Sequence, residues 1–270
     1  MLDFTKIASE IKDAPAVERE KNKVLVADGN YLMQRFFHAR GHVFGPEIDE
    51  LLKSLRSALK LDKTLLLFDS GRSAYRTAIL PSYKGNRPEK DEAMTDCFRK
   101  TRSYFNCRQG ADLMTLRLKD TEADDIAAFI AKTYKGKAEI YLYSIDHDWF
   151  QLLDEGIYQI RPDIKSGRDL VYSRKSASDL LGYDAKKWPL VAAFKGDPSD
   201  NVPSTGIKEN TALRWLNKYA WSLPSVFANE KSAKAKEAQI WRNYMLTKLD
   251  GSPCAFTDKD LDLLDDFMLD

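Results

Sequence analysis

Four aspartates stand just after short apolar segments of the chain, at points where strands of a parallel sheet would end. They are Asp28, Asp69, Asp146 and Asp148. A single aspartate after a strand is usually a turn residue, but three successive segments that end in this way argue against turns alone. Functional groups gather at the carboxyl ends of the strands in an open parallel sheet. We therefore expect these carboxylates to converge, although they are far apart in sequence.

Three more carboxylates open a predicted helix, in the segment Thr121-Glu122-Ala123-Asp124-Asp125. Acids in a first helical turn cap the helix and offset its macrodipole, and that role needs only one or two carboxylates. Three of them beside the strand-end aspartates repel one another, which raises their pKa values unless cations neutralise the charge. Hard divalent cations that prefer oxygen ligands, Mg²⁺ or Mn²⁺, are the expected neutralisers.

A loop with the sequence Lys-Gly-Asp-Pro-Ser-Asp-Asn, residues 195–201, contains two further candidate ligands, Asp197 and Asp200. Pro and Gly favour a tight turn here, and aspartates three residues apart in such a turn can point the same way. An ordinary loop is also rich in Asp, Pro and Ser. Composition alone therefore leaves a structural and a functional role equally open.

The segment after this loop carries candidate contacts for a DNA phosphate. It leads through Gly206 into a predicted helix at residues 212–219. Free amides at the start of a helix bind anions, and Lys208, Thr211 and Arg214 lie close to that start in sequence. We expect these groups to contact the DNA backbone.

A basic segment supplies the opposite charge. Tyr83, Lys84 and Arg87 belong to the sequence Tyr-Lys-Gly-Asn-Arg. The two cations could polarise a scissile phosphate and stabilise the charge that develops during an in-line displacement, and the tyrosine ring could stack on a base. A solvated basic loop explains the same residues about as well until their surroundings are known.

Short apolar segments are expected to position these residues. They are residues 23–27, 63–68 and 138–143. Each has the length of a buried strand, and helical patterns at 47–61 and 121–134 precede the second and the third. Strands that alternate with helices predict an α/β fold with a central, mostly parallel sheet and helices on both faces. Apolar residues at helical spacing predict a packing helix within residues 1–20.

The composition is that of a soluble globular protein, with 43% hydrophobic and 31% charged residues. Three cysteines without a CxxC pair are typical of a reducing compartment. The chain has no run of 18 apolar residues, so we expect no membrane helix. A zinc site at His38 and His42 is disfavoured, because neighbouring glycines weaken the helix and no third ligand stands nearby.

A formal net charge of +1 hides a separation of sign along the chain. Residues 84–119 contain nine Lys or Arg and five Asp or Glu. Residues 205–249 contain eight Lys or Arg and three Asp or Glu. The tail from Cys254 carries six acids against Lys259. Two basic zones that flank an acidic centre would suit a polyanion held by its backbone. Residues 84–120 also lack strong apolar periodicity, which is typical of a functional insertion between strands.

Taken in order, these motifs resemble the 5′-nuclease (flap endonuclease) superfamily, above all the bacterial and phage 5′–3′ exonucleases and the N-terminal nuclease of bacterial DNA polymerase I. The matching blocks are Val26–Asn30 with Arg35–Ala39, Phe68–Gly71, Tyr83–Arg87, Glu122–Asp125, Ser144–Asp148 and Lys195–Asn201. They extend over about residues 24–220, most of the chain. One block alone is unspecific, whereas six in the same order are specific.

The resemblance implies a division of the chain and a role for each motif. Residues 1–185 would form a PIN-like nuclease core with a helical arch insertion at 84–120, and residues 186–270 a helix–three-turn–helix DNA-binding region with the tail. Two or more divalent ions would be bound, the first by Asp28, Asp69, Glu122 and Asp124 with Asp125 at the border, the second by Asp146, Asp148, Asp197 and Asp200. Lys84 and Arg87 match the phosphate-steering pair, and Tyr83 matches the stacking residue. The expected DNA contacts are Arg35, Gly206, Lys208, Thr211 and Arg214.

The implied activity is that of a metal-dependent 5′–3′ exonuclease and 5′-flap endonuclease on DNA in replication or repair. The expected form is a monomer in the cytoplasm of a bacterial cell or a phage-infected host. RNA–DNA hybrids are a further implied substrate, and a polymerase or a single-strand-binding protein an implied partner. Two alternatives stay open: a PIN-type ribonuclease, which generally lacks the 195–201 loop, and a non-catalytic structure-specific DNA-binding factor, although none of the nine acidic positions is substituted.

Two segments depart from the family pattern. After Asp200, residues 201–212 are one residue shorter than usual and have Lys208 in place of the second glycine. In the family this segment forms a hairpin that often holds a K⁺ ion. The departure leaves open whether the hairpin at residues 201–212 binds such an ion. The acidic tail matches no family motif, and packing onto the core is favoured over a role as a partner-binding peptide.

Overall fold

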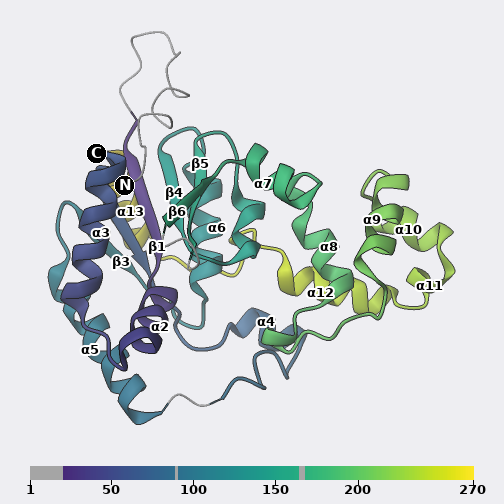
Figure 1. Cartoon of the computed structure of the whole chain (residues 1–270), viewed down its shortest axis with the longest axis horizontal. Coiled ribbons are helices and arrows are strands. Elements are labelled where there is room, and N and C mark those ends of the chain that lie inside the picture. Colours follow the sequence, from purple (N-terminus) through teal and green to yellow (C-terminus); the bar gives the residue numbers. More distant parts are fainter. Residues whose placement is uncertain (1–20, 89–90, 164–167) are drawn as a thin grey trace, which may run out of the picture.

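A computed structural model describes residues 21–88, 91–163 and 168–270 (Figure 1). The helix predicted within residues 1–20 lies outside the described residues. The strands are β1 (Lys23–Asp28), β2 (Lys63–Leu67), β3 (Leu113–Leu116), β4 (Glu139–Tyr143), β5 (Ile157–Asp163) and β6 (Arg168–Tyr172). The α-helices are α2 (Gly29–Arg40), α3 (Gly45–Leu59), α4 (Ala74–Ile79), α5 (Glu92–Arg108), α6 (Ala123–Thr133), α7 (Arg174–Leu181), α8 (Trp188–Lys195), α9 (Glu209–Lys218), α10 (Leu223–Asn229), α11 (Lys231–Lys234), α12 (Glu237–Thr247) and α13 (Asp258–Leu269). Short 3-10 helices are η1 (His147–Leu152), η2 (Ala185–Lys187) and η3 (Pro198–Asp200).

The strands form one six-stranded sheet in the order β3-β2-β1-β4-β5-β6. The first five strands run parallel, and β6 pairs antiparallel with β5. The three strands predicted from sequence are β2, β1 and β4, which are neighbours at its centre. In the register of the sheet, Asp28 lies opposite Leu67 and Ala27 opposite Tyr143. The acidic residues that follow these strands therefore start from the same edge, as expected.

Helices cover both faces of the sheet, which confirms the predicted fold class. Alternate residues of a strand point to opposite faces, and Val24 and Val26 pack in one core with α6 and α13. Leu25 and Ala27 pack in the other core with α2, α3 and α5. Within the described ranges every helix is too short or too polar to span a bilayer.

The prediction for residues 84–120 was wrong in extent. Helix α5 lies inside this range and buries Phe98, Thr101 and Phe105, and the two phenylalanines belong to the core with α2 and α3. Strand β3 also lies inside it and forms the edge of the sheet beside β2. The apolar residues of α5 are widely spaced among charged ones, so the sequence shows weak periodicity although the helix packs tightly. The arch stays a prediction for the part of this range that precedes the packed face of α5.

Helices α8–α12 share a separate core that contains Phe194, Trp215, Leu216, Phe227 and Ile240. Helices α9–α11 form a lobe apart from the sheet (Figure 1). The division of the chain at residue 185 stays a prediction.

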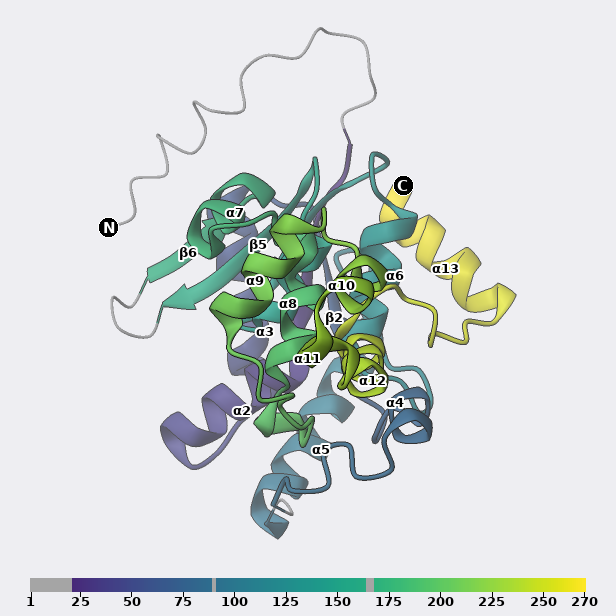
Figure 2. The ribbon, with the colours of Figure 1, turned by 90° about the vertical axis from the view of Figure 1, so that its right-hand side faces the viewer.

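The acidic tail packs back onto the core, as favoured from the sequence. Helix α13 lies beside α6 (Figure 2) and buries Leu264, Phe267 and Met268. The Lys63 ammonium donates to the Phe267 carbonyl oxygen at 2.9 Å, which ties the helix to the start of β2. Although α13 follows the C-terminal lobe in sequence, it therefore stabilises the core around the sheet.

Candidate active site

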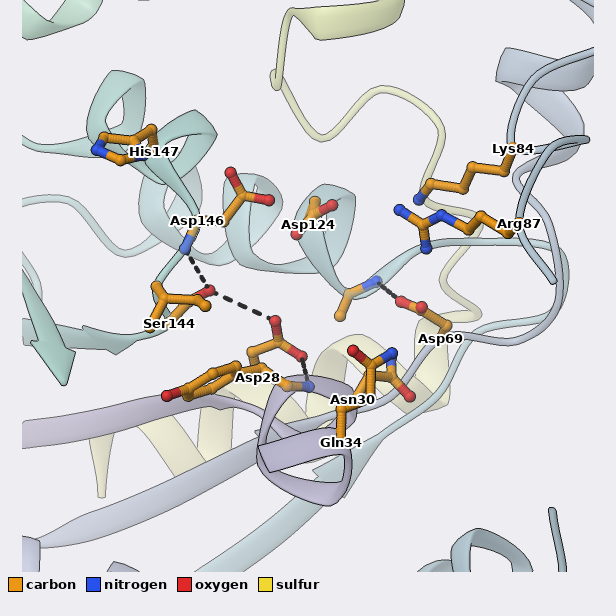
Figure 3. Close-up of a pocket in the computed structure, with 13 residues that line it drawn as sticks. Asp28, Asn30, Gln34, Asp69, Lys84, Arg87, Asp124, Ser144, Asp146 and His147 are labelled. Carbon is orange, nitrogen blue, oxygen red and sulfur yellow. Dashed lines mark hydrogen bonds between the residues drawn. The ribbon is translucent and has the colours of Figure 1, made fainter. Parts of the chain in front are cut away.

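A cavity of about 330 Å³ lies at the carboxyl ends of the central strands (Figure 3). Its walls carry the carboxylates Asp28, Asp69, Asp124 and Asp146 and the cations Lys84 and Arg87. A smaller cavity of about 70 Å³ adjoins it and is lined by Asp124, Asp146, Asp148, Asp197 and Asp200, with the same two cations and Arg76. Asp124 and Asp146 line both cavities, so the acidic residues form two groups that meet in these two side chains.

The first group is positioned by contacts at the ends of β1 and β2. Asp28 caps helix α2 by accepting a hydrogen bond from the Tyr31 amide at 2.9 Å, and Asp69 accepts one from the Ala123 amide at 2.8 Å. Gly29 is required at the turn, because a Cβ there would lie 2.4 Å from the Phe68 ring. These aspartates therefore act as caps and also line the cavity, so the structural and the functional explanation hold together.

The second group is positioned by η1 and by the loop after α8. Asp146 caps η1 by accepting from the Asp148 amide at 2.8 Å. Asp197 caps η3 in the same way through the Ser199 amide, also at 2.8 Å. The short turns thus present their carboxylates to the smaller cavity.

Two tryptophans that sequence reasoning missed hold one carboxylate in each group. The Trp149 indole donates to Asp124 at 2.7 Å, and the Trp188 indole donates to Asp148 at 2.6 Å. The only signal in the sequence was that Trp149 directly follows Asp148.

Crowding shifts the acid–base properties of these carboxylates. Burial and the charges of Asp124 and Asp69 raise the pKa of Asp28 well above its usual value. Burial and Asp124 raise the pKa values of Asp69 and Asp146 to about 6, and burial with Asp146 raises that of Asp148. Burial and like charge both disfavour the ionised form of a carboxylate, and a bound cation would offset both effects.

The basic segment is fastened to the loop that bears the second acidic group. The Asn201 side chain donates to the Ser82 carbonyl at 2.7 Å, and the Asn86 side chain donates to the Pro198 carbonyl at 2.8 Å. Lys84 donates to Glu122 at 2.7 Å, and Arg87 donates to Asp200. Both cations therefore stand beside the carboxylates, where an entering phosphate would meet them.

The stacking role expected for Tyr83 is wrong. Its side chain is buried, with 3% of the residue exposed, and its hydroxyl donates towards Glu122 at 3.1 Å and Asp200 at 2.9 Å. A ring enclosed in this way offers no free face to a base. Tyr83 instead links Glu122 to Asp200.

The structure also contradicts the role expected for Asp125, that of a ligand at the border of the first metal site. Its two oxygens accept hydrogen bonds from the Arg76 guanidinium, one of them at 2.9 Å, and the side chain is fully buried away from both cavities. Glu122 lies between Arg76 at 3.3 Å and Lys84, and is itself 2% exposed. Since Arg76 neutralises Asp125, this carboxylate is a structural partner and not a candidate ligand.

The remaining carboxylates fit hard cations in chemistry. Within the described part of the chain, no three His, Cys, Asp or Glu side chains converge on a single point as they stand. Mg²⁺ binds through one or two carboxylates and keeps several waters, so the oxygen-lined cavity and its raised pKa values fit such an ion without direct convergence.

The residues expected to contact DNA lie on two separate elements. Gly206, with φ of 77°, and the exposed Lys208 lead into α9, and Thr211 and Arg214 lie in its first two turns. This helix starts without a side-chain cap. Arg35 instead lies on α2, where it donates to the Tyr143 hydroxyl at 2.9 Å. Only the four residues around the start of α9 are close together.

Comparisons with known proteins agree with this architecture. The family model described as 5′-3′ exonuclease, N-terminal resolvase-like domain, matches residues 23–180. The 5′-3′ exonuclease of Aquifex aeolicus is 28% identical over 222 residues, which are 78% of this chain and 72% of that protein. The thermostable DNA polymerase I of Thermus filiformis is 30% identical over 217 residues, which are 75% of this chain but 24% of the polymerase. The chain thus spans about a quarter of the polymerase's length.

Among solved structures, the T5 D15 protein co-crystallized with metal ions has a TM-score of 0.74 at 24% identity, over 91% of this chain and 96% of that one. At this identity the likeness shows the fold. The family model, which covers more than half of the chain, shows the family. The chain belongs to the 5′–3′ exonuclease family, as its ordered motifs predicted.

Proposed function

We propose that the chain hydrolyses phosphodiester bonds of DNA near a 5′ end or a flap junction, as a metal-dependent 5′–3′ exonuclease and 5′-flap endonuclease in replication or repair. The observation that carries this proposal is the pair of acidic cavities that share Asp124 and Asp146 beside Lys84 and Arg87. A phosphate suits this cavity, because it can contact the two cations directly and the carboxylates through the metal ions that they bind.

In this proposal the two acidic groups hold two or more Mg²⁺ or Mn²⁺ ions. The ligands are Asp28, Asp69 and Asp124 for one ion and Asp146, Asp148, Asp197 and Asp200 for the other. Bound divalent ions supply an activated water and Lewis-acid stabilisation of the phosphate charge. Glu122 acts from behind the cavity, because it holds the Lys84 ammonium in place. Lys84 and Arg87 bind and orient the phosphate, and their charge stabilises the charge that develops on it.

The proposed DNA contact around α9 is supported by exposure and charge. Lys208 and Arg214 are exposed, and α9 starts without a side-chain cap. Glu209 lies in the first turn but is paired with Lys195 at 3.3 Å, which reduces its repulsion of a phosphate. RNA–DNA hybrids as substrate, a K⁺ ion at the hairpin, and a polymerase or single-strand-binding protein as partner stay predictions.

Incubation of the whole chain with a labelled 5′-flap duplex and Mg²⁺ or Mn²⁺ tests the proposal. We expect products cut near the flap junction, and no product when EDTA is present. An all-RNA single strand of the same sequence is the control, because a PIN-type ribonuclease would prefer it. Tight flap binding without cleavage in either metal would instead indicate a non-catalytic DNA-binding factor.

The pKa values near 6 of Asp69 and Asp146 predict a pH-dependent stabilisation by Mg²⁺. Because these folded-state pKa values lie above the unfolded value of 3.8, their contribution to stability is full below about pH 3.8 and is lost as the pH rises through about 6. Mg²⁺ offsets the repulsion of the ionised groups. Melting temperatures measured with Mg²⁺ and with EDTA should therefore differ more at pH 7.5 than at pH 5.0.

The variant Asp69→Asn provides the control for this prediction. It removes one of the titrating carboxylates, so the extra effect of Mg²⁺ at pH 7.5 should become smaller. An equal effect of Mg²⁺ at both pH values in the unaltered chain would contradict the prediction.

A further inference from the structure

The indole groups of Trp149 and Trp188 each donate to one oxygen of an acidic side chain at the cavities. Trp149 bonds to Oδ1 of Asp124, and Trp188 bonds to Oδ1 of Asp148. Asp124 lines both cavities and Asp148 the smaller one. Each acidic group thus contains one carboxylate whose Oδ1 oxygen accepts a hydrogen bond from an indole.

Both rings pack against neighbouring side chains. Trp149 is fully buried among the residues that pack around α6. Trp188 stacks on the His147 ring, with centroids 5.8 Å apart and planes inclined by 22°. An indole N–H is a donor only, so a ring packed in this way favours one orientation of the carboxylate that accepts from it.

The short helix η1 contributes one residue to each of the two indole–carboxylate hydrogen bonds. Asp148 receives its hydrogen bond from the start of α8, and the adjacent Trp149 donates to the first turn of α6. The far end of α8 continues into the loop that bears Asp197 and Asp200. One packed unit therefore sets the orientation of carboxylates in both groups.

We propose that Trp149 and Trp188 are positioning residues for divalent-cation binding, Trp149 acting through Asp124 and Trp188 through Asp148. The inference deepens the proposed function and rests on its assignment of these carboxylates as ligands. Groups that orient the ligands of a metal alter its affinity by roughly 10- to 100-fold when they are removed. Because each indole lies against a carboxylate, its fluorescence also reports the charge in that group.

The substitutions Trp149→Phe and Trp188→Phe separate this role from simple packing. Phenylalanine keeps an aromatic ring in the core and removes the N–H donor. Trp215→Phe is the matched control: Trp215 is also buried, at 7% exposure, in the core of α8–α12 against which Trp188 packs, and it lines neither acidic cavity. Thermal unfolding of each variant reports the cost of repacking. Trp188 is only half-buried, so its variant keeps the test valid if Trp149→Phe fails to fold.

Mn²⁺ binding to the whole chain, measured by calorimetry without DNA, tests the inference. We expect each of the two variants to weaken the binding of an ion by about tenfold or more, and Trp215→Phe to leave the isotherm unchanged. Titration with Mg²⁺ should change the tryptophan emission of the unaltered chain, and each of the two variants should remove part of that change. Variants that bind Mn²⁺ as tightly as Trp215→Phe would overturn the inference.

The result is distinguishable from a failure of the proposed function. If the chain binds Mn²⁺ and cleaves a flap but is insensitive to both substitutions, the positioning role alone is wrong. If the variants weaken Mn²⁺ binding but the unaltered chain cleaves no nucleic acid, the positioning role stands and the nuclease proposal is wrong. If the unaltered chain binds no Mn²⁺, both are wrong.

Discussion

Replacement of Asp69 by asparagine is expected to lower the rate of flap cleavage about 10³-fold while DNA binding persists. A unit charge about 4 Å from a cation contributes roughly 4 kcal/mol at an effective dielectric constant of 20, and each 1.36 kcal/mol corresponds to about tenfold in rate. The amide oxygen of asparagine can still accept from the Ala123 amide, which Asp69 contacts at 2.8 Å. The substitution therefore removes charge from the cavity and retains the local fold.

Single-turnover cleavage and binding of the same flap duplex measure the two parts of this expectation. Asp262→Asn is the control, because Asp262 is exposed on α13, and no residue of this helix lines either acidic cavity. Its rate should equal that of the unaltered chain. A near-normal rate for Asp69→Asn would remove Asp69 from the site, whereas loss of folding in this variant would show that its cap contact needs the charge.

The second large effect is expected for Arg76, which no motif of the sequence singled out. Its guanidinium is 2% exposed and contacts Asp125, Glu122 and the Leu246 carbonyl, the last at 2.9 Å. Removing one partner of a buried ion pair costs about 3–5 kcal/mol, because the other charge is left without compensation. Arg76→Met should therefore lower the unfolding free energy by about this amount, although methionine fills much of the volume.

Urea unfolding, monitored by circular dichroism, measures this change. Arg99→Met is the matched control, because Arg99 forms an exposed pair with Asp96 on α5 and its loss should change the stability little. The double variant Arg76→Met with Asp125→Leu should recover part of the loss, since it removes the unpaired charge of Asp125 while Glu122 keeps its partner Lys84. A change below about 1 kcal/mol for Arg76→Met would mean that water reaches Asp125 and Glu122.

Asp28, Asp69 and Asp146 show what the sequence by itself determined. Each follows an apolar segment whose length and composition predict a buried strand, and parallel strands bring their carboxyl ends to one edge. The register of β1 with β2 and β4 places these ends side by side. The family order of the motifs added Asp197 and Asp200, which line the smaller cavity. These predictions depend on local polarity and on a general rule of topology, so they need no knowledge of side-chain partners.

The partners of the charged and aromatic side chains were decided only by the tertiary structure. Tyr83 has the sequence context of an exposed stacking residue, yet it is enclosed between Glu122 and Asp200. Asp125 stands one residue from Asp124, but the turn of α6 directs it to Arg76, 49 residues away in sequence. The indole of Trp149 reaches Asp124 in the same way, from another element. A sequence pattern reports the polarity of one segment, whereas the state of a buried polar group depends on which distant group lies within hydrogen-bond reach. For this reason the sequence predicted where the acids gather, and the fold decided which of them face the cavity and which are neutralised behind it.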